Sequence, residues 1–229
     1  ATFDPKSGSW RIGLRTPRLW QSSFDDLKFE LRLNENSKHI GIFPEQEPHW
    51  TFIKKHNAQG GSLLNLFGYT GAATLFALKA GFSVTHVDAS TPSIAWAKRN
   101  LELSGLTKSP VRWILDDTVK FVNREIRRGR RYDAIILDPP AFGRGPKGEL
   151  WKLEDSLYEL LVSCGRVLSD HPLFIILTIY NIEASALMSA NIFRDIFGSE
   201  VTVESGELAL VEKSSERILP MSLWNLCKF

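Results

Sequence analysis

The sequence predicts an α/β protein, in which a largely parallel β-sheet is flanked by helices and preceded by a small β-rich extension. From Ser62 onward, short apolar runs alternate with segments of helical periodicity, as expected of repeated βα units. A glycine-containing turn follows the first apolar run, and aspartates follow the next three. We expect residues 1–60 to form the extension and residues 61–229 to form the main domain.

The chain has 229 residues and 43% hydrophobic content, enough for one full α/β domain with a small appendage. Its net charge of +2 gives no overall electrostatic case for nucleic-acid binding. A local basic run of five arginines between residues 124 and 131 is typical of a solvated helix end. No apolar run approaches the length of a membrane span, so we expect no membrane partner.

The two cysteines, Cys164 and Cys227, are too few and too far apart for a disulfide framework or a CxxC metal site. This usage favours a reducing compartment, and we expect a cytoplasmic protein. The five histidines show no HExxH or other ligand spacing, so we expect no bound metal. The oligomeric state is left open.

In the extension, residues 28–33 alternate polar and apolar side chains, which is typical of a half-buried strand. Turn-forming residues 34–37 follow and lead to a second candidate strand over residues 39–43. The sequence therefore predicts a hairpin that pairs these two segments.

Short apolar runs predict five strands in the main domain, over residues 63–67, 83–88, 111–115, 133–138 and 173–179. After the first strand, the alanine-rich segment from Ala72 to Ala80 predicts a helix. Thr91 followed by Pro92 predicts the start of another helix, and Ser104-Gly105 predicts its end.

Further along, the apolar stripe that begins at Leu150 and Trp151 predicts a helix ending near Gly165. Residues 184–197 are also predicted to be helical. The chain then ends with two predicted strands, over 201–211 and 221–229, joined by the polar turn 213–216.

The first apolar run leads into a turn with glycines at Gly68 and Gly71, a GxxG spacing. Glycine permits positive φ and lets the backbone approach a ligand closely. A dinucleotide site would favour GxGxxG, whose second glycine makes room for a pyrophosphate, and Tyr69-Thr70 occupies that region here. S-adenosylmethionine has no phosphate and needs only backbone amides and a polar partner. The predicted cofactor residues in this stretch are Asn65, Phe67, Gly68, Tyr69, Thr70 and Gly71.

Asp88 ends the second strand, 20 residues beyond Gly68, where a carboxylate can accept hydrogen bonds from two ribose hydroxyls. Ala89 and Ser90 follow and are assigned to the same site. The alternative is that Asp88 only caps the next helix. After the third strand, Asp117 is our candidate acceptor for an adenine amino group, with a solvent-facing loop acid as the alternative.

The fourth strand is followed by Asp138-Pro139-Pro140-Ala141-Phe142. Ligands of open α/β sheets bind at the carboxyl edge, where this motif is predicted to lie. The alternative is a turn in which the prolines end the strand and Phe142 fills the core.

Four motifs, NLFGYTG, VDAS, LDD and DPPAF, occur in this order between residues 65 and 142. Together they resemble the class I methyltransferases of the large-subunit ribosomal RNA methyltransferase group, which includes cytosine-5 and guanine-N7 members. The resemblance covers roughly residues 40–181. It implies a Rossmann-like fold with a mostly parallel seven-stranded sheet, helices on both faces, S-adenosylmethionine as cofactor and RNA as substrate.

In the wider superfamily, an Asp/Asn-Pro-Pro-aromatic motif marks many enzymes that methylate nucleobase nitrogens. By this resemblance Asp138, Pro139, Pro140 and Phe142 are the catalytic residues, and Asp138 is also one of the cofactor-binding residues. The Asp138 carboxylate and the carbonyl before Pro140 would accept hydrogen bonds from a base nitrogen. Phe142 would stack on a flipped-out base.

Cytosine-5 enzymes of this group carry a nucleophilic cysteine just after the fifth strand, because C5 reacts only after addition at C6. Here residues 178–181 read Thr-Ile-Tyr-Asn, and neither cysteine of the chain is at that place. We therefore expect no cytosine-5 chemistry, and Asn181 is closer to the polar residues of guanine-N7 members. Residues 41–46 resemble a GxFxDQ-like segment of the group, with Glu45 in place of aspartate.

We expect no separate RNA-binding domain of the kind that several relatives carry. Methylation of a small molecule or a protein therefore remains an alternative. A second alternative is a non-catalytic partner protein that binds the cofactor, but the intact DPPAF motif counts against it. A third alternative is a nicotinamide oxidoreductase, but the missing GxG counts against it.

Overall fold

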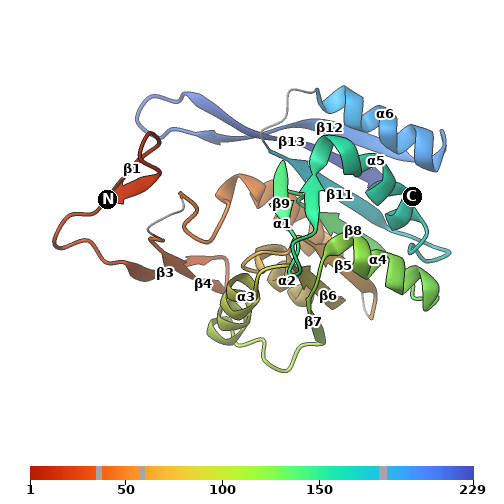
Figure 1. The fold of residues 1–229 in the computed structure, drawn as a ribbon, viewed down its shortest axis with the longest axis horizontal. Helices are drawn as coiled ribbons and strands as arrows, with labels where there is room; N and C mark the ends of the chain where they lie inside the picture. Colours follow the sequence, from red (N-terminus) through yellow and green to blue (C-terminus); the bar gives the residue numbers. More distant parts are fainter. Residues whose placement is uncertain (35–37, 57–59, 181–184) are drawn as a thin grey trace.

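The computed structural model describes residues 1–34, 38–56, 60–180 and 185–229 and is built around one seven-stranded sheet (Figure 1). Its strands are β5 (Ser62–Leu66), β6 (Ser83–Asp88), β7 (Val111–Leu115), β8 (Ala134–Leu137), β11 (Phe174–Ile179), β12 (Thr202–Val211) and β13 (Ile218–Lys228). They are arranged in the order β12-β13-β11-β8-β5-β6-β7. All neighbours are parallel except β13, which is antiparallel to β11 and β12. This confirms the predicted sheet.

In the described residues, six α-helices cover the sheet: α1 (Glu47–Lys55), α2 (Ala72–Lys79), α3 (Thr91–Leu103), α4 (Thr118–Arg127), α5 (Leu153–Gly165) and α6 (Ala186–Phe197). Successive strand residues enter different cores, since Leu64 packs with α4, α5 and α6, whereas Leu63 packs with α1, α2 and α3. Helices therefore cover both faces. Within the described part of the chain, none of the helices is both long and apolar enough to cross a bilayer.

The strand order places a topological switch at the centre of the sheet. The chain runs from β5 outward through β6 to β7, and then returns to β8, on the other side of β5. The loops after β5 and β8 thus leave the same edge in opposite directions. Such a crevice at the carboxyl ends of the strands is where open α/β sheets bind ligands.

Two predictions in the main domain need correction. The helix predicted to begin at Leu150 begins instead at Leu153, because Leu150–Lys152 forms strand β10 and pairs with β9 (Phe142–Arg144). The Trp151 indole donates to the Pro140 carbonyl at 2.6 Å, which holds this segment in the hairpin. Helix α6 begins at Ala186, and the predicted start at residue 184 lies outside the described residues.

The N-terminal hairpin is also different from the prediction. Strand β4 (Leu27–Arg32) pairs along its length with β3 (Leu19–Phe24), because Asp25 adopts positive φ in a tight turn between β3 and β4. Residues 39–43 form no strand, although the Ile40 carbonyl accepts the Arg32 amide at 2.9 Å. A second small pair joins β1 (Thr2–Asp4) to β2 (Ser9–Arg11). Of the predicted turn 34–37, residues 35–37 lie outside the described residues.

Side chains of α3 fix β4 to the main domain through buried hydrogen bonds. The Glu30 amide donates to Asn100 Oδ1 at 2.8 Å, and the Trp96 indole donates to the Glu30 carbonyl at 2.8 Å. Gly41 lies so close to the Trp96 ring that an added Cβ would be 2.3 Å from one of its carbons. Residues 44–46 then form the 3₁₀ helix η1 (Pro44–Gln46), which leads directly into α1.

A buried carboxylate fixes α4 against the sheet. Glu125 has no exposed surface and accepts hydrogen bonds from Arg112 at 2.9 Å, Tyr132 at 2.7 Å and Arg128 at 3.1 Å. Burial alone raises the pKa of the Glu125 carboxyl, but these donors outweigh burial and the pKa is lowered overall.

We expect Glu125→Gln to lower the free energy of unfolding by about 1 to 3 kcal/mol at neutral pH, because two arginines lose their charged partner. The folded pKa lies below the ordinary value of 4.5, so this stabilisation is present above that pH and is lost as the pH falls through the folded pKa. Urea unfolding at several pH values measures the free energy of unfolding of the parent, of the variant and of the exposed control Glu159→Gln. A difference from the parent that did not shrink in acid would contradict this account.

Candidate functional site

The turn after β5 carries several unusual backbone conformations. Phe67, Tyr69 and Gly71 all have positive φ, and Gly71 begins α2 in the left-handed region. At Gly68, an added Cβ would be 2.4 Å from the Cε1 atom of His86. The loop backbone therefore lies directly on a buried imidazole, which only glycine permits at this position.

A chain of buried polar groups supports the loop from below. Asn65 Nδ2 donates to Thr74 Oγ1 at 2.9 Å, and Thr74 Oγ1 lies 2.9 Å from His86 Nδ1. The Thr74 hydroxyl has a second lone pair and one proton, so either Thr74 or His86 can be the donor of this second hydrogen bond. Burial lowers the pKa of His86 to about 3, so the ring is neutral.

Asn65 and Thr70, the predicted polar partners of a cofactor, both have partners within the protein. The amide nitrogen of Asn65 is used by Thr74. The Thr70 hydroxyl donates to the Gly41 carbonyl at 2.5 Å, and its own carbonyl accepts from Asn100 at 2.9 Å. The Thr70 side chain thus fixes the loop to the extension. His86 and Asn100 were not predicted, because no local motif marks them.

Asp88, at the end of β6, connects the glycine loop to the start of α3. Its carboxylate oxygens accept the Tyr69 and Ser90 amides, each at 2.8 Å. Burial raises the pKa of Asp88, although both amides act against this shift. The cap of α3 is Ser90, whose hydroxyl accepts the Ser93 amide, and Ala89 lies between the two side chains. Asp88 therefore has a role other than the cap.

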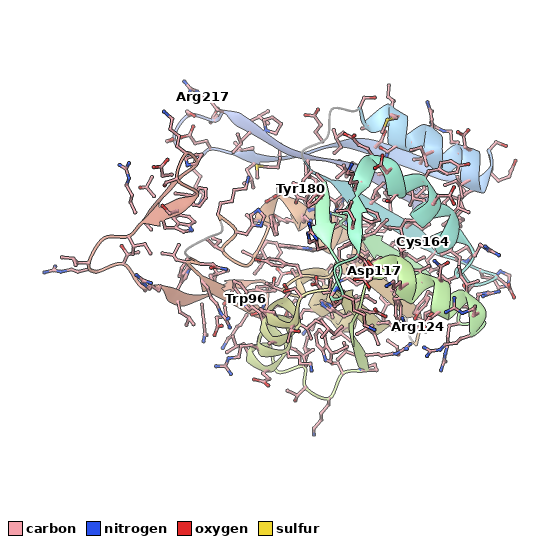
Figure 2. The ribbon with its side chains drawn as sticks, viewed as in Figure 1. Trp96, Asp117, Arg124, Cys164, Tyr180 and Arg217 are labelled. Carbon is pink, nitrogen blue, oxygen red and sulfur yellow. The ribbon has the colours of Figure 1, made fainter. Side chains whose placement is uncertain are left out.

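The acidic pair after β7 has structural partners. Asp117 caps α4 by accepting the Lys120 amide at 2.9 Å, and Asp116 forms an ion pair with Arg124. Figure 2 labels Asp117, which precedes α4, and Arg124, which lies within α4. Asp117 is not among the described residues that line the crevice.

The crevice lies between the loop after β5 and the end of β8. Its lining includes four aromatic side chains, Phe43, Trp50, Phe67 and Tyr69, and four polar ones, Gln46, Asn65, Thr70 and Asp138. Burial raises the pKa of the Asp138 carboxyl to about 7, with the Glu45 charge acting in the same direction and a hydrogen bond from Gln46 acting against it. The structure thus brings Asp138 together with the predicted glycine loop.

Gln46 and Tyr180 complete the surroundings of Asp138. Gln46 Nε2 lies 2.8 Å from Asp138 Oδ2 and 3.2 Å from the Tyr180 hydroxyl. The hydroxyl in turn lies 3.0 Å from Glu45 Oε1. The sequence offered only a partial signal for Gln46, in the GxFxDQ-like segment, and none for Tyr180. Asn181 lies outside the described residues.

The DPPAF motif leads into the β9–β10 hairpin. Phe142 is 57% exposed, so it does not fill the core. Strand register places Phe142, Arg144, Leu150 and Lys152 on one exposed face of the hairpin, whereas Trp151 packs inward. Residues 145–149 form the tip of this hairpin. An ion pair between Lys120 and Glu149 joins the tip to α4.

The cysteines lie apart from the crevice. Cys164 is in α5 and Cys227 is in β13, both buried, and burial raises the pKa of each thiol to about 12. Figure 2 shows Cys164 well separated from Tyr180. Across the described residues, no cluster of histidine, cysteine and acidic side chains could hold a metal ion.

The lining residues suit S-adenosylmethionine better than a phosphate-bearing cofactor. No lysine or arginine is among the described residues that line the crevice. Phosphates are commonly bound by such cations. Aromatic faces and a carboxylate are instead favourable surroundings for a positively charged sulfonium.

Comparison with known proteins agrees with this chemistry. A family model described as S-adenosylmethionine-dependent methyltransferase matches residues 3–186. A solved S-adenosylmethionine-dependent methyltransferase from Agrobacterium tumefaciens is 40% identical with a TM-score of 0.94, and the match covers 99% of this chain and 76% of that one.

Two curated relatives match shorter regions. The ribosomal RNA large subunit methyltransferase K of Neisseria meningitidis is 35% identical over 117 residues, which are 47% of this chain and 33% of the relative. The ribosomal RNA large subunit methyltransferase I of Pseudoalteromonas translucida is 28% identical over 156 residues, which are 68% of this chain and 38% of the relative. These matches thus span well under half of each relative. The family match and the Agrobacterium structure together show that the chain belongs to the S-adenosylmethionine-dependent methyltransferase family.

Proposed function

We propose that the chain transfers a methyl group from S-adenosylmethionine to a nitrogen of an RNA base, and that it does so in the cytoplasm. The observation that carries this proposal is the Asp138 carboxyl, which faces the crevice beside the glycine loop and has Gln46 on only one of its oxygens. The ribosomal RNA methyltransferase relatives support the choice of RNA. Both free, buried cysteines agree with a reducing compartment.

For the cofactor, we assign the backbone of residues 67–71 and the Asn65 side chain to its amino-acid end. Asp88 is assigned to the ribose hydroxyls, beside Ala89 and Ser90. Each Asp88 oxygen accepts one backbone amide and has a further lone pair for a hydroxyl. Asp117 is assigned to the adenine amino group. Its carboxylate accepts the Lys120 amide as the cap of α4 and has further lone pairs that can accept from the adenine.

When bound, the cofactor supplies an activated methyl group on a sulfonium, which leaves as a neutral thioether. The task of the protein is then to aim a nucleophile and exclude water. The ionised Asp138 carboxylate accepts an N–H of the base, together with the carbonyl of Pro139, and so directs the nitrogen lone pair. The nitrogen gains the methyl group and must lose a proton, for which Asp138 is a suitable acceptor because its pKa is raised to about 7.

The exposed face of the β9–β10 hairpin supports a nucleic-acid substrate. It presents Phe142 next to Arg144, with Leu150 and Lys152 on the neighbouring strand. An exposed aromatic ring can stack on a base taken out of its helix, and the cations can contact phosphates. We therefore assign base stacking to Phe142 and the support of Asp138 to Pro139 and Pro140.

The test is methyl transfer from isotopically labelled S-adenosylmethionine to RNA, protein and small-molecule pools, followed by nucleoside mass spectrometry. We expect label in RNA, on a base nitrogen. Label only in protein or metabolites would overturn the choice of RNA. Label on a ring carbon or a ribose oxygen would overturn the role of Asp138.

We expect Asp138→Ala to reduce methyl transfer at least about 100-fold, because the acceptor that aligns the nitrogen is lost. The affinity for S-adenosylmethionine should stay largely intact, since most residues assigned to the cofactor lie in the glycine loop and around Asp88. Transfer assays and calorimetric titration measure the two quantities, with the exposed Asp155→Ala as control. Transfer at the parent rate would refute the catalytic assignment.

We expect Gly68→Val to abolish measurable cofactor binding, because its Cβ would be 2.4 Å from the His86 ring and the loop would have to move. Calorimetric titration with S-adenosylmethionine checks this outcome, and circular dichroism checks the fold. Gly13→Val, in an exposed loop, is the matched control. A folded Gly68 variant with the affinity of the parent would show that this loop does not bind the cofactor.

A further inference from the structure

Asp138 is one end of a chain of hydrogen bonds that reaches into the N-terminal extension. Gln46 Nε2 lies within hydrogen-bond distance of both Asp138 Oδ2, at 2.8 Å, and the Tyr180 hydroxyl, at 3.2 Å. The Tyr180 hydroxyl lies 3.0 Å from Glu45 Oε1. Glu45 and Gln46 are adjacent in η1, whereas Tyr180 follows the end of β11 (Figure 2).

The chemistry of the partners sets the direction of each bond. The Tyr180 hydroxyl gives its single proton to Glu45 Oε1 and presents a lone pair to Gln46 Nε2. The side-chain amide of Gln46 must then turn its amino group, and not its carbonyl, toward Tyr180. The same amino group has a second hydrogen, which points to Asp138.

We propose that Glu45 and Tyr180 are positioning residues, which orient the Gln46 amide so that Asp138 is held as a hydrogen-bond acceptor for the methyl-accepting group. This inference rests on the proposed role of Asp138. With the Gln46 amide reversed, its carbonyl would face the Asp138 carboxylate, and Asp138 would lose its only recorded donor among the described side chains. The acceptor geometry at the crevice therefore depends on two residues that do not line it.

Electrostatics gives this network a measurable signature. The titratable groups that face Asp138 are Glu45 in η1 and Tyr180 after β11. Burial and then the Glu45 charge raise the pKa of Asp138, whereas the Gln46 bond lowers it. Burial and the neighbouring carboxylates also raise the pKa of Tyr180, so its hydroxyl keeps its proton. Transfer that needs ionised Asp138 rises with pH through the pKa of Asp138.

Two variants separate the parts of the network. Tyr180→Phe removes the hydroxyl that orients Gln46, and the exposed Tyr158→Phe is its matched control. Glu45→Gln keeps an acceptor oxygen for Tyr180 but removes the charge, and the exposed Glu47→Gln is its control. Calorimetric titration with S-adenosylmethionine and thermal unfolding establish that each variant is folded and binds the cofactor.

We expect Tyr180→Phe to lower kcat about tenfold, the loss of roughly one hydrogen bond, with the cofactor affinity unchanged. Glu45→Gln should shift the acidic limb of the pH profile of kcat to lower pH, because a charge that raises the pKa of Asp138 is gone. Parent-like kcat in Tyr180→Phe together with an unmoved acidic limb in Glu45→Gln would overturn the inference.

A measurement without any methyl acceptor keeps this test separate from the proposed function. Carboxyl ¹³C NMR titration of the parent protein, with Asp138→Asn for assignment, reports the pKa of Asp138 directly. We expect a lower pKa in Glu45→Gln and no change in Glu47→Gln, whether or not RNA proves to be the substrate. An identical Asp138 pKa in the parent and in Glu45→Gln would show that the network does not act on this carboxyl.

Discussion

Partial burial of the Asp138 carboxyl, just beyond the end of β8, is the constraint on which the site depends. A carboxylate removed from water needs a hydrogen-bond donor, and the recorded one comes from Gln46, outside the parallel sheet. Gln46 keeps its place because α1 packs on α2 through the stacked rings of Trp50 and Phe76, 5.0 Å apart. The N-terminal segment is therefore a structural part of the crevice.

The same segment also reaches the glycine loop. Asn100, which is fully buried, donates to the Thr70 carbonyl and accepts from the Glu30 amide, so one side chain joins the loop, α3 and β4. Below the loop, Gly68 lies on the neutral ring of His86. These contacts hold the loop rigidly between a buried imidazole and the extension, which is the kind of preorganisation that a binding loop requires.

Sequence periodicity was enough to predict the sheet, because strands buried on both faces form continuous apolar runs such as residues 134–137. It was also enough to place Asp88 and Asp138 at the same edge, since parallel strands end together. Periodicity failed at Trp151, where a tertiary hydrogen bond to Pro140 selects a strand over a helix. Tyr180 could not be predicted either, because its role depends on contacts with η1 that are distant in sequence.

We therefore expect the cofactor to lie between the glycine loop and Asp88, with its reactive end toward Asp138. A crystal structure of the protein with S-adenosylhomocysteine tests this claim most directly. We predict that the ligand ribose contacts Asp88, that its sulfur faces Asp138, and that Gln46 still donates to Asp138. A ligand bound outside this crevice, or a sulfur directed away from Asp138, would contradict the account.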